Sequence, residues 1–164
     1  MIGFDTVFDT SFAADLTIME ESAELVKKLE KGDNKYPLFT SCCPGWIRFA
    51  ETKHPELLPY ISTCRSPMEM FGAVIKEYYK PADKEAGLET VSVAVMPCVA
   101  KKYEAARPEF VRDGVPDVDY VITTKELISM IRELGIQFNE LEPGSPDMPF
   151  SISSGSGVIF GVTG

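Results

Sequence analysis

Apolar residues recur along the chain with two spacings, one typical of amphipathic helices and one typical of buried strands. Residues 12–31 carry apolar side chains at helical spacing and are followed by Gly32, so they predict a helix that stops at this glycine. Ser66 can cap a second helix, with Pro67 in its first position and Glu69 placed to close a capping box. Further helices are predicted over residues 46–52, 67–79 and 127–134, the last one capped by residues 123–126.

Short runs rich in Val, Ile, Tyr or Phe lie between these helices and have the composition of buried strands. They cover residues 36–40, 91–96 and 119–123. Because helices alternate with strands, the sequence predicts an α/β fold of short, largely parallel strands flanked by helices. Residues 142–157 are rich in Pro, Gly and Ser and are predicted to form a loop.

The length and charge of the chain limit the classes of protein to which it can belong. Its 164 residues suit one domain, and 25 Asp and Glu against 16 Lys and Arg give a net charge of −9. This acidity argues against nucleic acid or an anionic membrane as the main partner. We find no secretory signal and no apolar run of the roughly 18 residues that a membrane helix needs, so we expect a cytoplasmic protein. The apolar, Gly-rich end at residues 156–164 is unlike the usual polar terminus and leads us to expect a truncated chain.

The cysteines are the main candidates for chemistry. Cys42 and Cys43 follow one predicted strand and Cys98 follows another, and no pair has the C-x-x-C spacing of zinc sites. Ligands of open α/β sheets bind at the carboxyl ends of strands, where the two motifs can meet. Adjacent side chains in extended backbone point in opposite directions, so Cys42 and Cys43 are not expected to bind the same atom. Thiolate ligation suits an iron–sulfur cluster, while buried unreactive thiols or a disulfide from Cys98 to one of the pair remain alternatives.

Two carboxylates and one imidazole complete the set of candidate residues. Glu21 and Glu24 lie three positions apart on the first predicted helix and therefore share a face. They form either a solvated acidic stripe or part of a carboxylate proton relay. His54, the only histidine, precedes Pro55 at a predicted helix end and is interpreted as a surface residue rather than a catalyst.

The residues around the cysteines resemble two sequence signatures of the [FeFe]-hydrogenase catalytic domain. The similarity extends outside the signatures and covers nearly the whole chain, so residues 1–164 resemble part of this two-lobed domain. The residues that carry the resemblance are Thr40-Ser41-Cys42-Cys43-Pro44-Gly45-Trp46, Met96-Pro97-Cys98-Val99-Ala100-Lys101-Lys102-Tyr103-Glu104, and the stretches 12–21, 121–124 and 154–157.

The resemblance implies an H-cluster, in which a [4Fe-4S] cluster is bridged to a two-iron unit with CO, cyanide and a bridging dithiolate. Cys43 and Cys98 match ligands of the [4Fe-4S] cluster, which is called the cubane below. Cys42 matches the thiol that passes protons to the amine group of the bridging dithiolate. Glu21, Ser62 and Glu24 match the residues that relay protons onward between this thiol and the protein surface. Around the two-iron unit, Lys101 matches the cation that hydrogen-bonds a cyanide ligand, and Met96, Pro67 and Ser66 match residues packed beside it.

The chain departs from the family pattern at three points. Met68 stands where many members carry a polar residue, and Cys64 matches no ligand. The third signature, C-x-x-x-C in a Gly-rich setting, is absent, as are the N-terminal ferredoxin-like modules. With Cys43 and Cys98 alone, four-thiolate ligation cannot be completed within these residues.

The resemblance implies the reaction 2 H⁺ + 2 e⁻ ⇌ H₂ in an anaerobic bacterium. Ferredoxin or another low-potential carrier would exchange electrons with the enzyme, and hydrogenase maturation proteins would supply the cofactor. One alternative is a hydrogenase-like iron–sulfur assembly protein, although the relay-type Cys42 with Met96 and Lys101 argues against it. The other is an H₂ sensor of low turnover, which domains outside this chain would decide.

Overall fold

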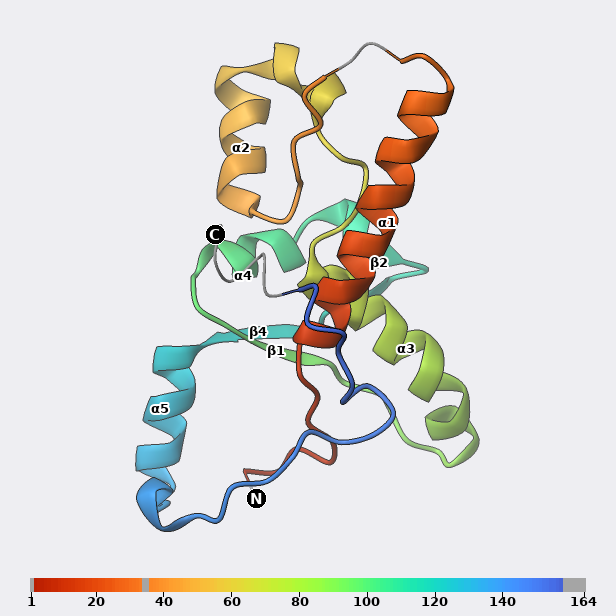
Figure 1. Cartoon of the computed structure of the whole chain (residues 1–164). Coiled ribbons are helices and arrows are strands. Elements are labelled where there is room, and N and C mark those ends of the chain that lie inside the picture. The colour runs from red at the N-terminus through yellow and green to blue at the C-terminus, as the bar shows by residue number, and fades with distance from the viewer. Residues whose placement is uncertain (1, 34–35, 158–164) are drawn as a thin grey trace.

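Helices pack around a short parallel sheet, and a small hairpin lies at the edge of the molecule, in the computed structural model, which describes residues 2–33 and 36–157 (Figure 1). The helices are α1 (Ser11–Glu30), α2 (Pro44–Lys53), α3 (Pro67–Glu85), α4 (Ala100–Ala105) and α5 (Thr124–Glu133), with 3-10 turns η1 (Pro55–Tyr60), η2 (Pro108–Phe110) and η3 (Phe138–Glu140). The strands are β1 (Val93–Met96), β2 (Val111–Arg112), β3 (Val115–Pro116) and β4 (Tyr120–Thr123).

The central sheet joins β1 to β4 in parallel, from Val93 opposite Tyr120 to Met96 opposite Thr123. Strands β2 and β3 form a separate antiparallel pair. Helices and short parallel strands therefore alternate as the sequence predicts, and the α/β fold class is confirmed.

The predicted strand over residues 36–40 is wrong. Within the described residues, this segment contributes one isolated parallel bridge, from Phe39 to Ile61. The bridge cannot extend backwards because Ile61 directly follows η1, whose residues are already helical. Pro37 also lacks the N–H that a strand ladder needs. The first cysteine motif consequently does not follow a strand of the β1–β4 sheet.

The predicted helices all form, with changes at their ends. Helix α2 begins at Pro44, two residues before the predicted start, because Cys43 acts as its N-cap. Helix α3 continues to Glu85 instead of ending near Tyr79, with Pro81 inside it. The residues after Pro81 are good helix formers, and the Asp83 carboxylate accepts a hydrogen bond from the Thr90 hydroxyl.

The two predicted helix caps have different outcomes. Thr123 and Glu126 form a reciprocal capping box at the start of α5, which confirms this prediction. At α3, Ser66 Oγ accepts the Glu69 N–H at 3.3 Å, so the cap itself is confirmed. The capping box is wrong, however, because the Glu69 carboxylate turns into the protein and does not reach back to Ser66.

Two apolar clusters hold the helices to the sheet. One packs Ala13 of α1, Phe71 of α3 and Phe150 of the C-terminal loop together with neighbouring aromatic rings. The other joins Met68 of α3 to Val118 and to Val121 of β4. This second cluster places the start of α3 beside the end of β1, where both predicted signatures converge.

Residues 142–157 form the predicted loop, which is tied to α1 at the opposite end of the sequence. The Asp15 carboxylate accepts backbone N–H groups of Ser154 and Gly157, the latter at 2.6 Å. These bonds lower the pKa of Asp15, because they stabilise its charged form.

Within the described ranges, no helix is long and apolar enough to span a membrane. The apolar stretch from residue 158 onward lies outside the described residues.

Candidate functional site

The adjacent thiols Cys42 and Cys43 have different environments, as the alternation of extended backbone predicts. Cys43 caps α2 and is exposed, and its Sγ accepts the Trp46 N–H at 3.5 Å. Cys98 follows β1 and is also exposed. All four cysteines are unbridged, so the disulfide alternative is wrong.

Lys101 connects the two cysteine motifs. Its Nζ donates to the main-chain oxygen of Cys42 at 2.7 Å and to Glu104 Oε2 at 2.7 Å. The Lys101 side chain is 13% exposed and that of Glu104 only 5%. The motifs therefore meet as predicted, but through this lysine rather than through neighbouring strands of one sheet.

Cys42 is a half-buried thiol near charged groups of both signs. Burial raises its pKa, while the Thr40 hydroxyl and the Lys101 ammonium oppose this effect. The Thr40 oxygen lies 4.0 Å from the Cys42 sulfur. A thiol in this setting stays protonated near neutral pH and can hand on a proton, whereas the exposed Cys43 is better placed to bind metal.

Glu21 lies close enough to Cys42 to raise its pKa further by charge repulsion. Burial in turn raises the pKa of Glu21, although the Ser62 hydroxyl and the Ser41 N–H counteract this. One carboxylate oxygen of Glu21 is buried without a hydrogen-bond partner among the described residues. Such a carboxyl can take up and release a proton more readily near neutral pH than a solvated one.

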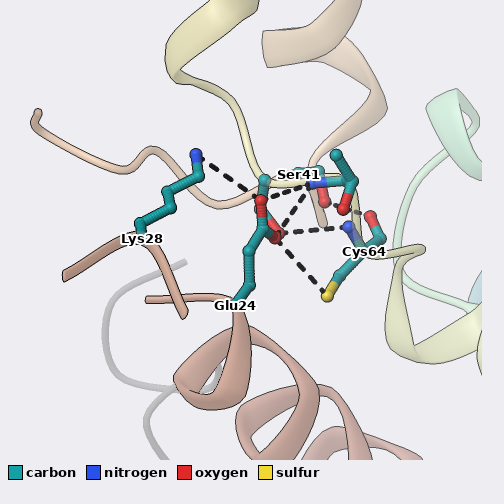
Figure 2. Close-up of polar contacts among 6 residues, drawn as sticks. Glu24, Lys28, Ser41 and Cys64 are labelled. Atoms are coloured by element: carbon teal, nitrogen blue, oxygen red, sulfur yellow. Dashed lines mark hydrogen bonds and ion pairs between the residues drawn. The ribbon is translucent and has the colours of Figure 1, made fainter. Parts of the chain in front are cut away.

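Glu24 is held by a dense set of donors, shown in Figure 2. Its Oε2 accepts the Ser62 hydroxyl at 2.8 Å and the Thr63 N–H at 3.1 Å. Lys28 Nζ lies 3.5 Å from Oε1, and the Cys64 thiol lies 3.9 Å from Oε2. These contacts favour the relay interpretation over a solvated acidic stripe.

Ser62 occupies the middle of this polar chain. It is buried, and its Oγ accepts the Cys64 N–H at 3.1 Å while it donates to Glu24. A hydroxyl has one proton to give, so it can pass its proton to Glu24 while it receives another from a protonated Glu21. A row of polar side chains thus leads in space from the cysteine motif toward Lys28. It consists of Cys42, Glu21, Ser62 and Glu24.

The remaining predicted residues lie at the junction of α3 and β1. Ser66 is buried as the N-cap of α3, Pro67 is the first helical residue, and Met96 ends β1 and packs against the cluster that contains Met68. His54 is exposed, with its Nδ1 2.9 Å from Glu56, in agreement with its interpretation as a surface residue.

Two buried acids near Lys101 were not predicted as site residues. Glu104 pairs with Lys101, a contact that the Lys-x-x-Glu spacing on a helix could have indicated. Glu69 is fully buried, and neither carboxylate oxygen has a partner among the described residues. Burial and the charge of Glu104 raise its pKa to about 7. No sequence signal identifies Glu69, because a glutamate at this helix position usually serves as a cap.

A cavity of about 300 Å³ lies between these groups. Ser62 and Cys64 of the relay region border it, as do Ser66 at the start of α3 and Glu104. Ser62 of the relay and Glu104, the partner of Lys101, therefore border one cavity, although they lie 42 residues apart in the sequence.

The donor set fits an iron–sulfur cluster in part. Cys43 and Cys98 present exposed, unbridged thiols, which are the ligands such clusters use. No group of three or more Cys, His, Asp or Glu side chains that could bind a metal ion occurs within the described part of the chain. These residues thus match two of the four thiolates that a cubane needs.

Comparisons with known proteins identify the family of the chain. Residues 1–164 match the family described as "Iron only hydrogenase large subunit, C-terminal domain". The chain is 51% identical to the NADP-reducing hydrogenase subunit HndD of Solidesulfovibrio fructosivorans, over 99% of this chain and 29% of that protein. It is 40% identical to the cytosolic iron-sulfur assembly component 3 of Rattus norvegicus, over 87% of this chain and 31% of that protein.

Solved structures give the same result for the fold. A variant of the [FeFe]-hydrogenase HydA1 from Chlamydomonas reinhardtii superposes with a TM-score of 0.81 at 43% identity, over 93% of this chain and 38% of that one. The chain thus spans less than two fifths of the length of the relatives named here.

Proposed function

The chain belongs to the family of the iron-only hydrogenase large subunit, C-terminal domain, and we propose that it forms part of an enzyme that catalyses 2 H⁺ + 2 e⁻ ⇌ H₂. The observation that carries this proposal is the row of polar side chains that runs from the half-buried Cys42 thiol through Glu21 and Ser62 to Glu24. An enzyme that consumes protons at a buried site needs such a path for them, whereas a protein that only carries a cluster does not.

The cofactor of this proposal is an H-cluster, held in part by this chain. Cys43 and Cys98 would each give one thiolate to its [4Fe-4S] cluster. Lys101, with its ammonium fixed between Cys42 and Glu104, would hydrogen-bond a cyanide ligand of the two-iron unit. Among the other residues of the junction, Met96, Pro67 and Ser66 would pack beside that unit. When bound, the cofactor would supply the redox-active metal site that takes electrons from the carrier for the reduction of protons.

The residues of the chain would deliver the protons. The Cys42 thiol would give its proton to the cofactor side and regain one from Glu21, whose raised pKa makes it a ready donor. Ser62 would donate to one carboxylate while it accepts from the other, and Glu24 would exchange protons with solvent beside Lys28. Once all these transfers are complete, one proton has passed and each protein group is back in its starting protonation state.

The partners of this function are proposed from the reaction. A low-potential carrier such as ferredoxin would exchange electrons, and maturation proteins would deliver the two-iron unit, in the cytoplasm of an anaerobic bacterium. Neither nucleic acid nor a membrane has a part in it, which is consistent with the net charge of −9.

Hydrogen evolution by the full-length protein tests this function. The protein that contains this chain would be matured with the two-iron unit and supplied with reduced ferredoxin, and H₂ would be measured by gas chromatography. We expect sustained H₂ production that fails when the two-iron unit is withheld. A fully loaded protein that neither makes nor consumes H₂ would overturn the proposal.

The second candidate is an iron–sulfur assembly function, which the 40% identity to the rat assembly component favours. That function predicts transfer of a cluster from the loaded protein to an apo-acceptor without any H₂ chemistry. Parallel measurement of acceptor loading and H₂ evolution on the same preparation separates the two candidates.

A further inference from the structure

Ser41 belongs to the first cysteine motif, and the proposed function has no role for its side chain. It directly precedes Cys42 and is half-buried. Its hydroxyl donates a hydrogen bond to the main-chain oxygen of Cys64, 23 residues later in the chain. Figure 2 shows both residues beside the Glu24 carboxylate. The bond therefore joins the cysteine motif to the segment that carries Ser62.

A parallel bridge between Phe39 and Ile61 is another tie between the same two segments. In it, the Phe39 N–H donates to the Tyr60 oxygen at 2.8 Å, and the Ser62 N–H donates to the Phe39 oxygen at 2.7 Å. Because this bridge is isolated, it aligns the two segments at Phe39 but does not continue as a strand ladder toward the cysteines. The Ser41 hydroxyl adds an attachment two residues further along, next to the relay thiol.

The main chain around Cys64 holds the relay groups in place. The Cys64 N–H donates to Ser62 Oγ at 3.1 Å, and the Thr63 N–H donates to Glu24 Oε2 at 3.1 Å. Ser62 donates its single proton to the same Glu24 oxygen at 2.8 Å. Since Ser62 Oγ accepts the Cys64 N–H, its proton is directed to the carboxylate. The alignment of Ser62 with Glu24 therefore depends on where this stretch of main chain lies.

We propose that Ser41 is a positioning residue for the proton relay, whose hydroxyl holds the Cys64 main chain and thereby keeps Ser62 aligned with Glu24. This inference rests on the proposed function for its effect on turnover. Ser41 acts through the main chain of Cys64 and does not itself carry the proton. Alignment of this kind matters because a displacement of about 1 Å can slow a reaction by about 10²-fold.

The first experiment needs no cofactor. Amide hydrogen exchange of the full-length apoprotein reports how often the Thr63 and Cys64 N–H groups lose their bonds. Ser41→Ala should raise both exchange rates by about fivefold or more, since one hydrogen bond is lost. Ser41→Thr keeps the hydroxyl and should restore the wild-type rates. Ser41 borders the cavity of about 300 Å³, which leaves space for the added methyl group.

Ser92→Ala is the matched control. The Ser92 hydroxyl also donates to a main-chain oxygen, that of Asp117 at 3.0 Å, but it lies directly before β1 and has no contact with the relay segment among the described residues. Its removal should leave the exchange of Thr63 and Cys64 unchanged. Unchanged exchange in Ser41→Ala, or equal acceleration in Ser92→Ala, would overturn the proposal.

The second experiment measures H₂ evolution and its solvent isotope effect on the loaded full-length protein. Ser41→Ala should lower turnover by about tenfold or more and raise the isotope effect, because proton delivery becomes the slow step, while the iron content stays that of the wild type. Ser41→Thr should recover most of the turnover, and Ser92→Ala should keep both values. Lower turnover without a larger isotope effect, or without recovery in Ser41→Thr, would refute the positioning role.

The two experiments separate failure of this inference from failure of the proposed function. If the loaded wild-type protein neither makes nor consumes H₂, the proposed function fails. The exchange rates of the apoprotein variants still decide for or against the hold of Ser41 on the Cys64 main chain.

Discussion

The ammonium of Lys101 donates to the main-chain oxygen of Cys42 at 2.7 Å, across a separation of 59 residues. This contact joins the two cysteine motifs, and the same ammonium also pairs with the buried Glu104. The arrangement of the candidate site therefore depends on a contact that is made entirely by protein atoms.

Replacing Lys101 by methionine tests how much this contact contributes to the stability of the protein. Lys101→Met leaves the buried Glu104 without its cation, and we expect the free energy of unfolding of the full-length protein to fall by about 3 kcal/mol. Lys102→Met is the matched control, because the Lys102–Glu126 pair is exposed and should contribute little to stability. Urea denaturation measures both, and equal losses would contradict the interpretation.

Cys42→Ser tests the proton relay. A serine hydroxyl is a far weaker acid than a thiol, so we expect turnover to fall by about 10²-fold or more while the iron content stays near that of the wild type. Iron analysis and H₂ evolution on one preparation measure the two effects. Cys64→Ser, the same substitution beside Glu24, should retain most activity. Parallel loss of iron and activity in Cys42→Ser would make Cys42 a structural or ligating residue instead.

Cys98→Ala tests ligation of the cubane. Removal of one thiolate from a four-thiolate cluster should abolish its characteristic visible absorption and lower the iron content. Cys64→Ala is the control for loss of a thiol and should keep the absorption. A normal spectrum in Cys98→Ala would exclude this cysteine as a ligand.

The pH dependence of stability should carry opposite signs for Glu69 and Glu126. The pKa of Glu69 rises from 4.5 to about 7 on folding, so its contribution is present at low pH and is lost as the pH rises through this range. Glu69→Gln should remove this loss, worth up to about 3 kcal/mol.

Glu126 behaves in the opposite way, because Lys102 and Thr123 lower its pKa to about 2. Its contribution is present above pH 4.5 and is lost as the pH falls toward 2. Denaturation curves of the two glutamine variants from acidic to neutral pH measure both trends. If the effect of the substitution on stability changed with pH in the same direction in both variants, the opposite pKa shifts of Glu69 and Glu126 would be refuted.

Gly72 of α3 packs closely against the segment that leads into β4. A Cβ atom there would lie 2.6 Å from Val118 Cγ2 and even closer to the Asp117 carbonyl oxygen. We expect Gly72→Ala to destabilise the protein by about 1–3 kcal/mol despite the better helix propensity of alanine. Gly144→Ala, at a loop position with open space around it, should change the melting temperature little. Comparable shifts in the two variants would argue against a steric cause.

Local signals in the sequence predicted the helices and their caps, because hydrophobic spacing and capping side chains act within a few residues. Thr123 with Glu126 is an example that holds in full. The strand at residues 36–40 failed because its pairing depends on Ile61, which lies outside any local window. The family resemblance supplied the candidate residues, but their contacts came from the fold.

The buried acids mark the limit of sequence interpretation. Glu69 has the position of a capping residue, and only the packing of α3 against its neighbours shows that its carboxyl faces inward. The Lys-x-x-Glu spacing could have indicated the contact of Glu104 with Lys101, but the burial of this pair depends on how α4 meets the first motif. Both effects arise from tertiary packing, which overrides local preference.

The bonds from Asp15 to the loop at residues 154–157 also bear on how the protein is made. Asp15 and Ser154 are 139 residues apart, so at a synthesis rate of about 5–20 residues per second the carboxylate emerges from the ribosome roughly 7–30 s before its partner. Helix α1 must complete its contacts with this loop after translation of the intervening chain. Until then α1 can pack against α3 but lacks these bonds from Asp15, and a ribosome stalled before residue 154 would hold a chain without them.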